Sequence, residues 1–239
     1  MNSIRATTFL CIAALACFAN ADEPPGFVSL FDGKSLDGFQ YDERFWRVED
    51  NAIIGETTSS NAAERNTFLI LGDEKYSDFE LRFSYQVDGF NSGVQYRSVE
   101  KPGFVVDGYQ ADFEAQWHGD GKTDKFSGMF FEENGRMFLG KRGQAVIVRA
   151  GDDGPRIDVI GTVGDAVELE KNIRRDDWNE YTIVARGYQF THIINGRVMS
   201  VAYDEDAENR RAEGIFAFQL HSGPPMKIQI KHLKVRRLR

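Results

Sequence analysis

Three observations on the sequence predict an all-β fold, a sandwich or jelly roll of packed sheets. The 239-residue chain contains 19 phenylalanines and 23 glycines but only 6 prolines, and such a composition favours strands joined by tight turns. About a dozen short apolar or alternating segments follow one another with turn residues between them. No long amphipathic helical pattern occurs, and all-β single domains of this length are common.

The first half of the chain predicts strands over residues 26–31, 66–71, 79–87, 93–97 and 109–114. Alternation is clearest in residues 79–87, where Phe79, Leu81, Phe83, Tyr85 and Val87 share the face expected to meet the core. Residues 32–39 have turn composition. A hairpin over residues 45–55 is expected to turn at Asp50-Asn51.

The second half predicts two more hairpins, which turn at Asn134-Gly135 and Asn195-Gly196. Further strands are expected over residues 144–149, 178–185, 214–221 and 226–235. Residues 150–177 are charged and rich in turn residues. Residues 204–213 are acidic and tolerate a helix, so they are the one helix candidate.

The N-terminus has the layout of a secretory signal peptide over residues 1–21, which leaves a mature domain over residues 22–239. Arg5 precedes an apolar run over residues 9–18 that is too short to span a bilayer, and residues 19–21 form a small-x-small cleavage site. We therefore expect an exported protein, periplasmic or extracellular, without stable membrane insertion after cleavage. Lipidation of Cys17 stays open but is not favoured, because the preceding leucine stands one place too late for a good lipoprotein box.

Composition narrows the chemistry further. Both cysteines, Cys11 and Cys17, fall in the signal segment, so the mature chain is expected to have no disulfide, no cysteine nucleophile and no cysteine metal ligand. The formal net charge is −8 with no long basic run, which argues against a nucleic-acid partner. An acidic, aromatic-rich β domain suits a neutral ligand such as a sugar.

Three of the predicted strands each carry a polar face. Side chains alternate along a strand, so polar residues two apart lie on the same face. The three faces are formed by Gln95 and Arg97, by Gln110, Asp112 and Glu114, and by Gln219 and His221. They predict either the floor of a sugar-sized cleft or ordinary solvated strands.

Six motifs follow one another along the chain: LFDGKSLDG at 30–38, NSGVQYR at 91–97, GYQAD at 108–112, WN at 178–179, ING at 194–196 and FQLH at 218–221. In their order and spacing the chain resembles the DUF1080 family, also called the 3-keto-disaccharide hydrolase domain. The resemblance implies a concanavalin A-like jelly roll of two antiparallel sheets, one of them concave. It also implies cleavage of the glycosidic bond in sugars already oxidised at C3. Two features depart from the family pattern: Gln110 replaces a usual Glu, and the segment 128–165 is longer and more charged.

A ketone at C3 acidifies the C2 proton, and its removal allows the C1 substituent to leave by elimination, with water adding back later. His221 is the expected base, because an imidazole near its ordinary pKa of about 6.5 suits neutral pH. Arg97 is expected to stabilise the developing negative charge, with a salt bridge to Asp112 as its alternative role. Asp112 is expected to orient His221, to act as the base itself, or to hold a cation.

Substrate hydroxyls are expected to bind Gln95, Gln110, Glu114 and Gln219, although these side chains suit a merely solvated sheet as well. Glu132 is expected to be solvated. No metal is required by this chemistry, but His221, His118 and Asp112 could share a divalent cation.

Two other functions stay open. Residues 110–114 are similar to the Glu-x-Asp-x-Glu strand of laminarinase-like retaining glycosidases, but Gln110 stands where the carboxylate nucleophile would be. A lectin-like binding module is the non-enzymatic alternative, because jelly rolls host both functions. Release of an aglycone from a 3-keto-glucoside separates enzyme from binder.

Overall fold

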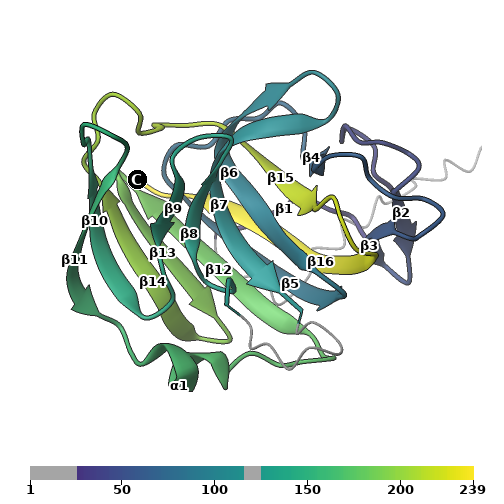
Figure 1. Cartoon of the computed structure of the whole chain (residues 1–239). Helices are drawn as coiled ribbons and strands as arrows, with labels where there is room; N and C mark the ends of the chain where they lie inside the picture. Colours follow the sequence, from purple (N-terminus) through teal and green to yellow (C-terminus); the bar gives the residue numbers. More distant parts are fainter. Residues whose placement is uncertain (1–25, 116–124) are drawn as a thin grey trace, which may run out of the picture.

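The computed structural model describes residues 26–115 and 125–239, which form two stacked β-sheets (Figure 1). The signal peptide expected at residues 1–21, with Cys17, lies outside the described residues, and so does His118. Within the described part, no helix is both long and apolar enough to cross a bilayer.

The larger sheet contains ten of the described strands. Its main path runs β11 (Arg156–Thr162), β10 (Gln144–Arg149), β14 (Arg197–Asp204), β13 (Gln189–Ile194), β12 (Asn179–Arg186), β5 (Phe79–Asp88), β16 (Met226–Arg237), β3 (Ala52–Thr57) and β2 (Trp46–Glu49). The short strand β1 (Val28–Ser29) pairs with β16. The described pairings of this sheet are antiparallel except for β10 with β14, which run parallel.

The smaller sheet contains six described strands and is antiparallel throughout them. Its order is β4 (Thr67–Ile70), β15 (Ile215–Leu220), β6 (Asn91–Lys101), β7 (Val105–Glu114), β8 (Phe130–Glu133) and β9 (Met137–Gly140). Strands β6 and β7 are joined by a hairpin, whereas β15, which pairs with β6, lies far from both in the sequence. This sheet brings the three strands that carry the predicted polar faces side by side.

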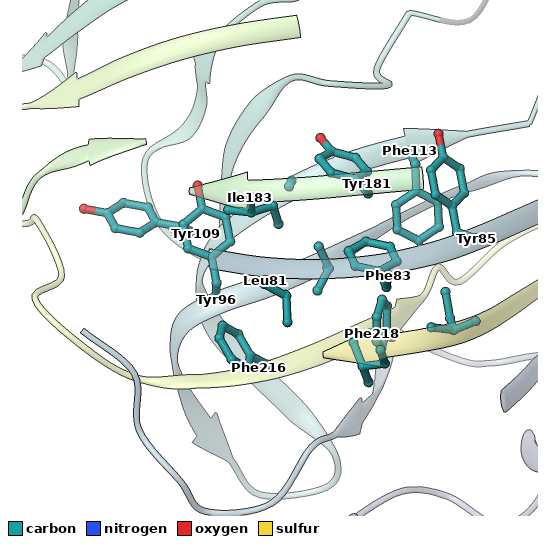
Figure 2. Packing of buried hydrophobic residues seen from close by; sticks show 14 of the residues in the cluster. Leu81, Phe83, Tyr85, Tyr96, Tyr109, Phe113, Tyr181, Ile183, Phe216 and Phe218 are labelled. Carbon is teal, nitrogen blue, oxygen red and sulfur yellow. The ribbon is translucent and has the colours of Figure 1, made fainter. Parts of the chain in front are cut away.

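The hydrophobic core fills the space between the sheets. Figure 2 shows aromatic side chains from β5 and β12 of the larger sheet meeting those from β6, β7 and β15 of the smaller one. The alternating segment behaves as predicted, because Phe79, Leu81, Phe83 and Tyr85 are all buried. Phe83 packs edge-on against Phe218 of the opposite sheet, with ring centroids 5.1 Å apart. The all-β sandwich expected from the sequence is therefore confirmed.

The three tight hairpin turns also lie where the sequence predicts them. Asp50, Asn51 and Asn195 adopt positive φ angles of 50°, 58° and 49°, the left-handed conformation that such turns require. Asn134 does the same, with φ 53°. These turns connect β2 to β3, β13 to β14, and β8 to β9.

Two predicted elements differ in the structure. The strand expected over residues 26–31 is present only as Val28–Ser29, both exposed, which pair with Val235 and Lys234 of β16. Residues 204–213 form no helix, since Asp204 ends β14 and Asp206 instead caps a turn through Asn209. The one described helix, α1 (Ala166–Glu170), begins after Asp165, whose carboxylate accepts hydrogen bonds from two backbone amides.

Strand β6 contains a bulge that changes the alternation of its side chains. Tyr96 pairs with Tyr109, but the next pair is Val99 with Asp107, so two residues of β6 face one of β7. Arg97 lies in this bulge with φ 47°. Gly214 permits it, because a Cβ there would lie 2.3 Å from the Arg97 carbonyl carbon.

Candidate functional site

A pocket of about 410 Å³ opens on the face of the smaller sheet that points away from the core. Strands β7, β8 and β15 give its polar lining, together with the loop before β4: Asn66, Gln110, Asp112, Glu133, Gln219 and His221. Phenylalanine and methionine side chains line it toward the edge strand β9: Phe126, Phe131, Met137 and Phe138. Four of the residues predicted from the sequence, Gln110, Asp112, Gln219 and His221, thus share one pocket.

A chain of hydrogen bonds along the floor ends on the Asp112 carboxylate. Ser98 Oγ donates to Gln95 Oε1 at 3.4 Å, and Gln95 Nε2 donates to Gln110 Oε1. Gln110 Nε2 in turn donates to Asp112 Oδ1 at 2.5 Å. Gln95 is fully buried, so it positions Gln110 and does not line the pocket.

The floor needs a glycine at position 93. Gly93 pairs with Asp112 across the sheet, next to the Gln110 side chain. A Cβ at this position would lie 2.5 Å from Gln110 Cγ and 2.6 Å from its Cδ. Any side chain here would therefore force the Gln110 amide to shift from its position beside Asp112.

Glu133 forms a second carboxylate cluster in the pocket. Its two oxygens accept hydrogen bonds from Asn66 Nδ2 and Gln219 Nε2, each at 3.0 Å. Burial raises the pKa of Glu133, and the two amide donors and the charge of His221 partly offset that effect. The other amide atom, Gln219 Oε1, is buried and has no hydrogen-bond partner among the described residues.

The ring of His221 is oriented by its own neighbour. Its Nδ1 lies 2.6 Å from the Ser222 carbonyl oxygen, which can only accept, so Nδ1 carries the proton. In the neutral ring the other nitrogen, Nε2, is then the basic one. Phe90 stands edge-on to the ring with centroids 4.8 Å apart, and Ser222 is held by Asn66 Oδ1. His221 thus brings a proton acceptor to a polar pocket.

The structure does not bring Arg97 to this pocket. Because of the bulge in β6, its guanidinium turns to the end of the sandwich, where it donates to the carbonyls of Ser77 and Arg211 and pairs with Asp78. It also lies over the ring of Phe190. The expected alternative, a salt bridge from Arg97 to Asp112, is not formed either.

Glu114 lies outside the pocket as well. Its carboxylate accepts hydrogen bonds from the backbone amides of Lys125 and Phe126, so it holds the turn that leads to β8. Glu132 is not solvated as expected but 2% exposed. Its carboxylate binds Arg136 and Arg211 in a buried cluster on the other side of the strand from Glu133.

Glu133 and Asn66 were missed by the sequence reasoning. The alternation of β8 could have shown that Glu133 and Phe131 share a face, but only the pairing of Gly108 with Glu133 places that face beside Gln110. Asn66 comes from a loop and has no periodic signal.

No group of three metal-ligating side chains occurs within residues 26–115 and 125–239. Asp112 and His221 belong to the pocket, whereas the third residue considered for a cation, His118, is not described.

The fold is shared with solved structures that are named "putative glycosyl hydrolase" or carbohydrate binding module. A "putative glycosyl hydrolase" from Parabacteroides distasonis superimposes with a TM-score of 0.57 at 17% identity, covering 89% of this chain and 99% of that one. A second from the same organism gives 0.54 at 17% identity, covering 90% and 94%. Carbohydrate binding module CBM66 from Bacillus subtilis gives 0.52 at 15% identity, covering 83% and 95%. Identities this low show a common fold.

No curated protein sequence matches the chain significantly. A family sequence profile does, and it extends over residues 26–236, nearly all of the described chain and every strand of the pocket. The profile describes a 3-keto-alpha-glucoside-1,2-lyase-like domain, which agrees with the motifs found along the sequence. This chain therefore belongs to the 3-keto-alpha-glucoside-1,2-lyase-like (DUF1080) family of carbohydrate-active domains.

Proposed function

We propose that this protein cleaves the glycosidic bond of 3-keto-glycosides by eliminating the C1 substituent across C1 and C2. The observation that carries the proposal is His221, whose Nδ1 is committed to the Ser222 carbonyl so that Nε2 is the basic atom in the pocket. Family membership supports the substrate class, and the polar lining suits a sugar ring.

The reaction is redox-neutral. His221 Nε2 takes the C2 proton, and the C2–H electrons form an enolate with the C3 oxygen. When the C3 carbonyl re-forms, a C1=C2 double bond forms and the C1–O bond breaks with its electrons on the leaving oxygen. The imidazolium of His221 or water returns a proton to that oxygen. Later addition of water across C1=C2 gives the free keto-sugar.

The carboxylates of the pocket favour this proton transfer. Asp112 and Glu133 both line it, and among its described lining residues there is no arginine or lysine. Negative charge near an imidazole stabilises the imidazolium that forms. Each amide NH2 group of the lining has two N–H donors, so one that already bonds a protein oxygen has a second N–H for the C3 oxygen as charge develops on it.

The second candidate function is ordinary glycoside hydrolysis by a carboxylate pair. Gln110 removes one carboxylate from β7, but Glu133 on β8 supplies another that lines the same pocket as Asp112. Glycosidases need two such groups, one as acid and one as base or nucleophile.

The discriminating experiment compares a 3-keto-glucoside with the same glucoside unoxidised at C3. Elimination predicts release from the keto-substrate only, with a primary isotope effect when C2 carries deuterium. Release from the unoxidised glucoside would support the carboxylate pair instead. Saturable binding of both sugars without release of any product would show a lectin-like module and would refute both enzymatic proposals.

Export is a further part of the proposal, based on residues 1–21 of the sequence. Expression of the full chain in a Gram-negative bacterium, followed by fractionation and mass spectrometry, tests it. We expect a periplasmic or secreted protein that begins at Asp22. A lipid-modified N-terminus at Cys17 would indicate an anchored protein, and an uncleaved cytoplasmic chain would contradict export.

A further inference from the structure

We propose that the β8–β9 hairpin forms an aryl-aglycone subsite, in which Phe131, Met137 and Phe138 hold an aromatic leaving group. The inference rests on the proposed function and narrows it, from 3-keto-glycosides in general to those with an apolar ring attached at C1. The sugar would occupy the polar half of the pocket, over β7 and β15.

The polar and apolar halves of the pocket meet along one line of paired residues that crosses the sheet. Gln95 pairs with Gln110, Gln110 with Phe131, and Phe131 with Phe138 across four neighbouring strands. Paired residues point to the same side of a sheet. The lining therefore changes from amide to phenyl in a single step between β7 and β8. A ligand whose polar ring lies on Gln110 places its substituent against these phenyl groups.

The apolar half is a small aromatic cluster with open surface. Phe131 and Phe138 meet edge-on with centroids 5.0 Å apart, and Phe138 stacks with Phe126 at 6.1 Å and 18°. Phe138 is 47% exposed and Met137 is 51% exposed, although both line the pocket. Apolar surface left open beside a polar pocket is typical of a ligand site.

The backbone at Met137 supports the same conclusion. Met137 has φ +66°, a conformation that costs free energy for any residue except glycine and is found more often for asparagine or aspartate than for other residues. Folding alone would favour glycine in this position of the hairpin. Met137 is one of the residues that line the pocket, and methionine has a flexible thioether of the kind that contacts aromatic rings favourably.

The hairpin offers few polar partners to a second sugar. Its polar lining residues are already engaged, because Asn134 donates to the Val106 carbonyl and Glu133 binds Asn66 and Gln219. Sugar hydroxyls placed against Phe131, Met137 and Phe138 would lose water without gaining partners. An aromatic ring gains contact area and ring-to-ring attraction there.

The test compares an aryl 3-keto-glucoside with the methyl 3-keto-glucoside, in the wild type and in Phe138→Ser and Met137→Gly. Both variants should raise KM for the aryl substrate about tenfold, the loss expected for one ring contact. KM for the methyl substrate should stay within about twofold. Met137→Gly should also raise the melting temperature, which separates this loss from unfolding. Val167→Ser, an exposed apolar residue of α1 outside the pocket lining, is the matched control and should change neither KM.

Equal losses for both substrates would overturn the inference, since they would mean that Phe138 contacts the sugar ring. No change for either substrate would overturn it too. Calorimetric titration with phenyl glucoside and methyl glucoside decides the question without turnover. If no keto-glycoside is cleaved, the proposed function fails, but tighter phenyl glucoside binding that is lost in Phe138→Ser still supports the subsite. Equal affinity for the two glucosides refutes it.

Discussion

Gln110 donates a hydrogen bond from Nε2 to Oδ1 of Asp112, two residues along the same strand, at 2.5 Å. The amide therefore holds the carboxylate in place while adding no second charge to the floor. Gln95 fixes the amide from the other side by donating to its oxygen. The glutamine that departs from the usual family motif is thus part of an oriented hydrogen-bond chain.

Gln110→Glu should shift the pH dependence of the reaction. Two carboxylates at hydrogen-bond distance cannot both ionise near neutral pH, so the pair would share a proton and titrate in two steps. We expect the acidic limb of kcat/KM to move to higher pH by about one unit, and activity at pH 6 to fall about tenfold. A pH profile of kcat/KM for both proteins measures this.

The matched control is Gln86→Glu. Gln86 Oε1 accepts from Gln229 Nε2 at 2.7 Å in the larger sheet, so this change also introduces a carboxylate into a glutamine pair. It should leave the pH profile where it is. If the Gln110→Glu profile also overlays that of the wild type, an ionised Asp112 is not needed for the reaction.

His221→Asn should lower kcat/KM for a 3-keto-glucoside by about a hundred- to ten-thousand-fold, the contribution typical of a general base. The C2 deuterium isotope effect on the residual rate should persist, because proton removal would then limit the rate even more strongly. His232→Asn is the control, since its ring bonds Ser84 Oγ on the larger sheet. A His221→Asn enzyme with near wild-type kcat/KM would exclude this residue as the base.

Local alternation was enough to predict one face of the pocket. Gln110 and Asp112 are two apart on β7, and Gln219 and His221 are two apart at the end of β15, so the pleat brings each pair to one side. Arg97 is two residues from Gln95 in the sequence, which predicts that the two side chains share a face, but in the fold the bulge turns Arg97 away from the pocket. A bulge depends on close packing around Gly108 and Gly214, which no local pattern reveals.

The errors elsewhere have the same cause, namely partners far away in the chain. Glu132 looks like a solvated residue until Arg136 joins it to Asp204, at N–O distances of 2.5 and 2.6 Å. Asp204 is bound in that ion cluster at the end of β14 and does not begin the helix predicted over residues 204–213. The position of Glu133 in the pocket follows only from the register of β8 against β7.

Glu133→Gln should remove an acidic limb from the pH profile. Burial raises the pKa of Glu133 above the ordinary value of 4.5, so lowering the pH protonates it earlier than an exposed glutamate. If its carboxylate stabilises the His221 imidazolium, kcat/KM falls as the pH drops through this raised pKa. The glutamine variant should be slower at neutral pH but lack that limb. A limb of unchanged position in the variant would assign it to another group.

Arg97→Met should destabilise the protein without a specific effect on catalysis. The buried guanidinium satisfies the Ser77 and Arg211 carbonyls and Asp78, and removing one partner of such a network costs about 3 kcal/mol. Urea unfolding should show this loss, while kcat well below the melting temperature stays near the wild-type value. Arg47→Met, which removes only exposed ion pairs to Glu49 and Glu56, should cost less than about 1 kcal/mol. A large fall in kcat for a folded Arg97→Met protein would restore the catalytic role expected from the sequence.

His192 should make the protein less stable as the pH falls from about 6.5 to 4. It is buried in the core, where Nδ1 donates to the Met129 carbonyl and the Tyr96 hydroxyl donates to Nε2. Burial lowers its pKa to about 4, from an ordinary value of 6.5. Above pH 6.5 the His192 ring is neutral in both the folded and the unfolded state. Between pH 6.5 and 4 the unfolded chain binds a proton at this ring and the folded protein does not.

The loss should reach about 3 kcal/mol by pH 4, from the difference between the two pKa values. Urea unfolding at several pH values measures it, and His192→Gln should flatten the dependence in this window. Asp32, Asp42 and Asp206, whose pKa values are lowered from 3.8, lose their stabilising effect only below that value, so they act in a separate window. Glu133 acts in the opposite direction, because a raised pKa makes the native state bind its proton first. A wild type whose stability is level from pH 7 to pH 4 would mean that His192 becomes charged without unfolding the core.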